Sequence, residues 1–145
     1  METIKDKSMN TKEIDLDISY KIINNNFILY INITNYSSEE QEFYFVNDTG
    51  ALARNGINIL NTKYEKLIPY ERTFISPVHN NLETNADKLL PNETKQYELS
   101  ASILTENNNL ILFFKGISFK IPKDEKFYIT FGFLGKTSNM LEIVI

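Results

Sequence analysis

Apolar side chains occupy every second position near the start of the chain, with polar side chains between them. The apolar positions are Ile14, Leu16, Ile18, Tyr20 and Ile22. A period of two places one set of side chains on one face of a β-strand, so residues 14 to 22 are predicted to form a strand with one buried face. Asn24-Asn25-Asn26 follows, and asparagine tolerates the left-handed backbone of tight turns. Alternation resumes over residues 27 to 34, which predicts a β-hairpin.

The same pattern occurs again later in the chain. Residues 97 to 103 alternate, Asn107-Asn108-Asn109 supplies a turn, and residues 110 to 115 run back. No window of twelve or more residues keeps the helical period of 3.6, and one turn of helix is the most that residues 81 to 90 allow. Further short strands are predicted at residues 42–47, 56–60, 117–121, 126–134 and 140–145. Eight or nine short strands favour an all-β, antiparallel sandwich of two sheets.

Residues 61–92 differ in composition from the strands. This segment holds three of the four prolines and the single histidine, together with aromatic residues that do not alternate. A loop of this length is uncommon in a compact domain and is often functional. Aromatic residues and arginine are enriched where proteins bind one another, so the segment is predicted to contact a partner protein. The predicted contact residues in it are Tyr64, Tyr70, Arg72, Phe74 and His79. The alternative is a crossover whose aromatic side chains close one open end of the core.

The chain has 145 residues, which suits one domain with a substantial core. We expect residues 13–145 to form this domain and residues 1–12 to be a polar tail. The absence of cysteine excludes disulfides and thiolate metal sites, and a single histidine cannot build a cage of several histidines. No cofactor or metal is therefore expected. With 15 basic and 19 acidic residues and a net charge of −4, the chain is not expected to bind nucleic acid.

No stretch of the sequence approaches the roughly 20 apolar residues that span a bilayer, so no membrane insertion is expected. The first twelve residues are polar and do not resemble a signal peptide. These features favour a cytoplasmic protein. A periplasmic protein or lipoprotein whose leader has been removed is the alternative.

Asp48-Thr49-Gly50-Ala51 matches the active-site string of retropepsin-like aspartic proteases, in which two chains each contribute one aspartate. Phe133-Leu134-Gly135-Lys136 is similar to a later element of those enzymes. However, Asn47 stands where the family places an apolar residue, and a glycine-rich flap is absent between the two elements. A turn at the end of a strand explains the same residues, because Asp, Thr and Gly each have turn chemistry.

Two other groups of residues invite a chemical interpretation. Ser76, His79 and Asp87 lie in the long loop, but no strand–turn–helix surrounds Ser76 to present it as a nucleophile. Asp15 and Asp17 share one face of the first strand, opposite its apolar positions. A solvated outer face explains that pair of carboxylates better than a cation site does.

Two turn sequences carry a resemblance to a known family. One predicted strand ends in Asn35-Tyr36-Ser37, and Leu89-Leu90-Pro91-Asn92-Glu93 precedes another. This combination resembles bacterial immunoglobulin-like sandwich domains, among them the bacterial intracellular proteinase inhibitors. Asn92 replaces the usual glycine, a substitution that asparagine permits where the backbone is left-handed. The resemblance implies an immunoglobulin-like sandwich that binds protein and has no catalytic residues.

Together these observations predict a non-catalytic protein-binding domain, most concretely an inhibitor or immunity protein that blocks an enzyme or toxin. A basic partner is expected because complementary charge speeds association, with Glu39, Glu40 and Glu42 as a steering edge. One alternative is a structural or adhesive module of a phage, pilus or envelope lipoprotein, whose copies pair through edge strands. The other is the aspartic protease with Asp48 as its catalytic residue.

Overall fold

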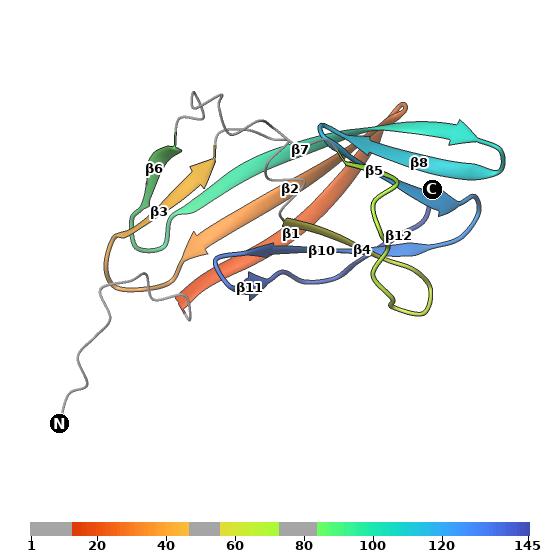
Figure 1. Ribbon diagram of the computed structural model, residues 1–145. Helices are drawn as coiled ribbons and strands as arrows, with labels where there is room; N and C mark the ends of the chain where they lie inside the picture. The colour runs from red at the N-terminus through yellow and green to blue at the C-terminus, as the bar shows by residue number, and fades with distance from the viewer. Residues whose placement is uncertain (1–12, 47–55, 73–83) are drawn as a thin grey trace.

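The structure is a computed structural model that describes residues 13–46, 56–72 and 84–145, and these residues are almost entirely β-strand (Figure 1). The strands are β1 (Ile14–Ile23), β2 (Asn26–Asn35), β3 (Gln41–Val46), β4 (Ile57–Leu60), β5 (Glu71–Arg72), β6 (Thr84–Leu89), β7 (Thr94–Glu106), β8 (Asn109–Phe114), β9 (Ile117–Pro122), β10 (Phe127–Phe133), β11 (Lys136–Thr137) and β12 (Leu141–Ile143). The pairings between these strands are antiparallel. The all-β antiparallel fold expected from the sequence is confirmed.

Six strands form the larger sheet, in the order β1-β2-β7-β8-β9-β5. Alternation gives this sheet an inner face of buried side chains, to which each long strand contributes. Leu29 of β2 lies opposite Leu99 of β7, and Leu112 of β8 lies opposite Phe119 of β9. Opposed side chains in neighbouring strands lie about 5 Å apart, so they pack into one continuous apolar layer.

A smaller sheet packs against this inner face. Its central strand is β10, with β4 along one edge and β11 and β12 along the other. Phe127, Ile129 and Phe131 of β10 are fully buried in the common core, while Tyr128 and Thr130 point to the opposite side of the sheet. Two layers with facing apolar surfaces make an open sandwich, which Figure 1 shows from the side.

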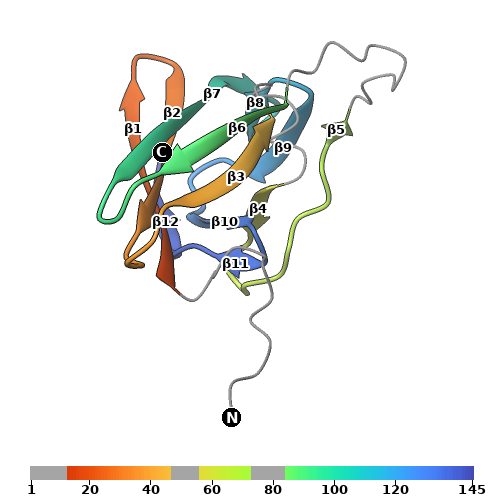
Figure 2. The ribbon, with the colours of Figure 1, turned by 90° about the vertical axis from the view of Figure 1, so that its left-hand side faces the viewer.

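β3 and β6 pair with each other in a third, two-stranded sheet at one end of the sandwich (Figure 2). Phe43 of β3 is buried, and its ring meets the ring of Phe133 edge to face at a centroid distance of 5.9 Å. Leu89 of β6 is fully buried as well. The small sheet therefore continues the second layer beyond the end of β10.

Side chains tie the edge strand β1 to the smaller sheet. The Ile18 N–H donates to Oδ1 of Asn139 (2.7 Å), and Nδ2 of Asn139 donates to the Ile18 carbonyl (3.0 Å). Lys136 Nζ donates to the carbonyl of Ile14. These bonds occupy backbone groups that a further strand would otherwise use, so they also protect part of this edge.

The asparagine turns have the predicted backbone. Asn24, Asn107 and Asn108 have φ angles of 55°, 49° and 64°, in the left-handed region, and they join β1 to β2 and β7 to β8. Asn92 also has a positive φ, of 66°, in the turn between β6 and β7. Asparagine thus replaces glycine at these positions at small cost.

Asn35 joins the two turns on which the family resemblance was based. Its Nδ2 donates to the carbonyls of Glu39 (2.8 Å) and Leu89 (2.9 Å), and its Oδ1 accepts from the Ser37 N–H (2.9 Å). The N–H of Asn92 donates to the Asn35 backbone carbonyl (2.6 Å). A fully buried amide with this many partners fixes the turns side by side.

Three details of the sequence prediction are wrong. Residues 84–89 form strand β6 instead of a helical turn, because they pair with β3. The segment 61–92 is interrupted by β5 and β6, so it is not one continuous loop. The described residues form twelve strands instead of the expected eight or nine, since β5 and β11 have only two residues each and owe their form to their partners. In the part of the chain that the structure describes, no helix is long and apolar enough to cross a membrane.

Candidate protein-binding surface

Residues 61–70 run from β4 of the smaller sheet to β5 of the larger sheet, and we call this segment the strap (Figure 1). The Leu67 N–H donates to the carbonyl of Ile59 in β4 (2.8 Å). The Tyr70 N–H donates to the carbonyl of Ser118 in β9 (2.7 Å). The strap is therefore hydrogen-bonded to both layers of the sandwich. The backbone of such a segment loses less conformational entropy when a partner binds.

Asn61 shapes the turn at the start of the strap. Its Oδ1 accepts hydrogen bonds from the N–H groups of Lys63 (2.9 Å) and Glu65 (3.0 Å), while its own N–H donates to the Glu65 carbonyl (2.9 Å). Tyr64 lies within this turn with a φ of 62°, a left-handed value that is unusual for a tyrosine. The turn thus fixes the direction of the Tyr64 side chain.

Tyr64 stacks on Tyr128, with ring centroids 4.7 Å apart and 27° between the planes. Tyr128 is buried, whereas 61% of Tyr64 is exposed. A hydrogen bond with Tyr128, followed by the Coulombic effect of the same residue, raises the pKa of Tyr64. Beside the pair, the carboxylate of Glu142 lies 3.2 Å from Lys126 Nζ and raises the pKa of that lysine. One ring face of Tyr64 is thus supported from below, and the other side of the residue faces outward.

Ile68 and Tyr70 continue the exposed apolar surface along the strap. Ile68 is 88% exposed and Tyr70 is 44% exposed. The Lys120 ammonium group lies 5.1 Å from the centre of the Tyr70 ring, a cation–π distance. The strap therefore presents two tyrosines and an isoleucine to solvent. This is the kind of surface at which aromatic anchors dominate protein binding.

The structure places only some of the predicted contact residues together. Tyr64 and Tyr70 both belong to the strap. Arg72 lies in β5, opposite Ile117 of β9. Phe74 and His79 lie outside the described residues. The predicted anchors that can be placed therefore come from the first part of the long segment.

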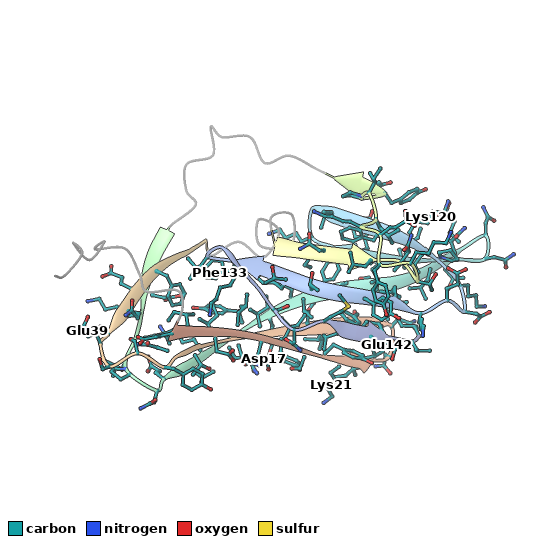
Figure 3. The ribbon with its side chains drawn as sticks, turned by 90° about the horizontal axis from the view of Figure 1, so that it is seen from below. Asp17, Lys21, Glu39, Lys120, Phe133 and Glu142 are labelled. Atoms are coloured by element: carbon teal, nitrogen blue, oxygen red, sulfur yellow. The ribbon has the colours of Figure 1, made fainter. Side chains whose placement is uncertain are left out.

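The predicted steering edge is remote from the strap. Glu39, Glu40 and Glu42 are exposed in and beside the turn before β3. Figure 3 shows Glu39 at one end of the molecule and Lys120, the neighbour of Tyr70, at the other. Exposed charges more than a Debye length of about 8 Å apart are largely screened at physiological salt. The acidic edge and the strap are thus two separate surfaces.

Sequence reasoning missed an apolar patch on the outer face of the larger sheet. Leu104 of β7 lies opposite Ile111 of β8, and Phe113 is two residues further along β8 on the same face. Leu104 is 52% exposed and Phe113 is 44% exposed, although Ile111 between them is buried. We call these three residues the outer-face patch. Its signal in the sequence is the uninterrupted apolar run of residues 110–114, in which the outward positions should have been polar.

The other chemical candidates have structural roles or lie outside the described residues. Asp87 accepts a hydrogen bond from the Tyr97 hydroxyl (2.5 Å) and lies 3.5 Å from Lys95 Nζ, so it links β6 to β7. Leu134 and Gly135 have positive φ angles in the turn between β10 and β11. Residues 47–50, with the protease-like string, and Ser76 are not among the described residues.

Asp15 and Asp17 are exposed on the outer face of β1, as predicted. Among residues 13–46, 56–72 and 84–145, no group of three or more His, Asp and Glu side chains is arranged to hold a metal ion. In comparisons with known proteins, no protein-family model matches the chain and no curated protein is significantly similar to it. The function must therefore be argued from the surfaces themselves.

Proposed function

We propose that this protein is a non-catalytic, protein-binding β-sandwich, and specifically a small inhibitor or immunity protein that blocks an enzyme or toxin. The observation that carries this proposal is the strap, in which Tyr64 and Ile68 are exposed on a segment bonded to both sheets. Tyrosine offers a large amphipathic contact area at a low cost in conformational entropy. A pre-arranged aromatic surface is what a tight inhibitor needs, because less order must be created on binding.

Charge contributes to the proposal in a more limited way. The net charge of −4 favours a basic partner at long range. The strap and its surroundings are mixed in sign, with Lys63, Lys66 and Lys126 near Glu65 and Glu142. For this reason the proposal places the contact on the aromatic strap and not on the acidic edge at Glu39.

A capture experiment with matched variants tests the proposal. The full chain is immobilised as wild type, as the double variant Tyr64→Ala/Ile68→Ala, and as Tyr36→Ala. Tyr36 is the matched control because it is a 64% exposed tyrosine outside the strap. We expect wild type and Tyr36→Ala to retain the same partner from a lysate of the native cells. The strap variant should lose it by at least tenfold in quantitative mass spectrometry, with an unchanged thermal unfolding midpoint.

The captured protein then gives the second half of the test. If it is an enzyme or toxin, adding the wild-type chain should reduce its activity, and adding the strap variant should not. Equal capture by the strap variant and wild type would place the contact elsewhere. Full activity of the captured protein in complex would contradict the inhibitor role while leaving the binding role intact.

The two rival functions draw less support from the described residues. Edge-strand pairing needs long exposed edges, but the strap bonds to β4, and β5 and β12 have only two and three residues. Among the described residues, this leaves β3 and β6, of six residues each, as edges on which a further strand could pair. Lys21 lies on the open end of β1, where a charged side chain discourages pairing. For the protease, the turn at Leu134 and Gly135 explains the second motif as hairpin geometry.

A further inference from the structure

We propose that the outer-face patch of Leu104, Ile111 and Phe113 binds a second copy of this chain and forms a dimer with twofold symmetry. This inference goes beyond the proposed inhibitor function and does not rest on it, although Lys120, which the dimer uses, contacts Tyr70 at the end of the strap. The starting observation is that two large apolar side chains, Leu104 and Phe113, remain half exposed at outward positions on either side of the buried Ile111. Exposure of apolar side chains to water is unfavourable. A contact that removes their surface from water is therefore stabilised by the hydrophobic effect.

The strand register defines the surroundings of the patch as two neighbouring rows across the sheet. The first row runs through Leu104, Ile111 and Lys120 on β7, β8 and β9. The second row runs through Ser102, Phe113, Ser118 and Glu71 on β7, β8, β9 and β5. Ser102 and Ser118 are small, so Phe113 stands above its own row. Packing two such faces together places a ridge of large side chains against a row of small ones.

A twofold axis that lies between the two rows, across the strands, exchanges the rows of the two copies. Phe113 of each copy then lies over the row of Leu104 and Ile111 in the other, where Leu104 is the exposed side chain. Lys120 of one copy lies over Ser118 of the second copy. Glu71 of the second copy is one strand away from that Ser118. Strands in a sheet are about 4.8 Å apart, a distance that a lysine side chain spans easily. The symmetry therefore creates two equivalent Lys120–Glu71 ion pairs, and this complementarity is what favours a second copy over an unrelated partner.

The same axis keeps the acidic part of each copy away from the other. Asp15, Asp17 and Glu98 lie on the outer face two or more rows away from the patch, and Figure 3 shows Asp17 on β1 away from Lys120. Exchange of the two central rows moves these carboxylates to opposite ends of the dimer. Like charges across an interface are unfavourable, so their separation supports this arrangement.

The expected interface is small. Four rows by four strands, with about 4.8 Å between strands and about 6.8 Å between same-face residues, cover roughly 500 Å² on each copy. Stable complexes usually bury about 800 Å² on each partner. We therefore expect a dimer that forms at high protein concentration and dissociates on dilution, not an obligate one.

Sedimentation velocity on the full chain tests the proposal. The apparent mass of the wild type should rise with concentration from 16.9 kDa towards twice that value. Leu104→Ser/Phe113→Ser should remain a monomer over the same range, because it removes the apolar contact. Circular dichroism and thermal unfolding check that each variant is folded.

A charge exchange makes the test specific for this arrangement. Lys120→Glu alone and Glu71→Lys alone should each abolish dimerisation, because like charges then meet across the axis. An equimolar mixture of the two variants should form a heterodimer, since each charge again faces its opposite. A nonspecific apolar association would not depend on these two charges, so neither the loss in the single variants nor the heterodimer in the mixture would be seen.

Each result supports or overturns the inference. If the wild type stays monomeric at all concentrations, the proposed dimer is overturned, and the patch does not bind a second copy of this chain. A dimer that persists in Leu104→Ser/Phe113→Ser, or single charge variants that fail to recover when mixed, overturns the proposed surface. Tyr64→Ala/Ile68→Ala should dimerise like wild type, so loss of partner capture and loss of dimerisation remain separable.

Discussion

The two halves of the outer face of the larger sheet differ sharply, although strand β7 runs through both. The half near Asn35 carries mostly polar side chains at outward positions, among them Asp15, Asp17, Asn32, Thr34, Gln96 and Glu98, with Tyr30 beside Glu98 as its aromatic member. The half near the hairpin turns carries Leu104, Ile111 and Phe113. Folding of a sandwich requires apolar side chains on the inner face alone. An apolar outward half therefore points to a second contact that the fold itself does not need.

The polar half also makes its own cross-strand bonds. Gln96 Nε2 donates to Asn32 Oδ1 (2.9 Å), and the hydroxyls of Thr34 and Thr94 lie 2.7 Å apart. Such exposed pairs contribute a few tenths of a kcal/mol to about 1 kcal/mol each. This half is thus adapted to water. Substitutions of single side chains in and beside each half test this difference through their effects on stability and self-association.

The largest effect should separate the two faces of β8 within the apolar half. Phe114 is fully buried on the inner face, and its neighbour Phe113 points outward. Phe114→Ala should lower the free energy of unfolding by about 3–5 kcal/mol, because it leaves a cavity in the core. Phe113→Ala should cost less than about 1 kcal/mol and mainly reduce self-association. Urea denaturation at low protein concentration measures both, and equal losses would contradict the assignment of faces.

The next effect concerns the end of the sheet beside the polar half. Asn35→Ala removes a buried amide and leaves the carbonyls of Glu39 and Leu89 without that donor. The Glu39 carbonyl keeps the Ser37 hydroxyl as a second donor. Each hydrogen bond lost at a buried group costs about 1–3 kcal/mol, so we expect a total loss of about 2–4 kcal/mol. Asn32→Ala is the matched control on the outer face and should cost less than about 1 kcal/mol. Similar losses of unfolding free energy for both variants in urea denaturation would show that the hydrogen bonds of Asn35 contribute no more to stability than an exposed pair does.

The sequence predicts those parts of this fold that depend on local signals. Alternation found both long hairpins, and asparagine marked their turns, because a left-handed turn is a property of a few adjacent residues. Strand β6 was missed because Thr84–Leu89 shows no alternation and becomes a strand through pairing with β3. Tyr64 and Tyr70 are exposed, and their role as contacts with a partner protein stays a prediction. The outer-face patch was not recognised, since an apolar run such as 110–114 also fits a strand buried on both faces.

A smaller effect is expected on the inner face beneath the polar half. Burial and then the hydrogen bond to Asp87 raise the pKa of Tyr97, so the folded protein holds this proton more tightly than the unfolded chain does. Tyr97→Phe should cost about 1–2 kcal/mol at neutral pH. The difference in unfolding free energy between wild type and Tyr97→Phe has its full value below about pH 10, where the tyrosine of the unfolded chain is protonated. This difference declines at higher pH.

Urea denaturation at about pH 9 and about pH 11 provides the check, because these values bracket the ordinary tyrosine pKa. The difference in unfolding free energy between wild type and Tyr97→Phe should narrow at the higher pH. A constant or widening difference would show that ionisation of Tyr97 is not linked to folding.

The smallest effect should come from the polar half itself. Asp15→Asn/Asp17→Asn changes two exposed carboxylates on β1 and should alter the unfolding free energy by less than about 0.5 kcal/mol. Dimerisation should persist, because these residues lie away from the proposed contact. A large loss of stability would show that the polar half is more than a solvated surface.

A dilution series followed by ¹⁵N NMR tests the difference between the two halves most directly. We expect concentration-dependent shifts at the amides around Leu104, Ile111 and Phe113, and constant shifts around Asp17 and Glu98. Constant shifts throughout, or changes centred on Asp17 and Glu98, would contradict the assignment of the apolar half as a contact surface.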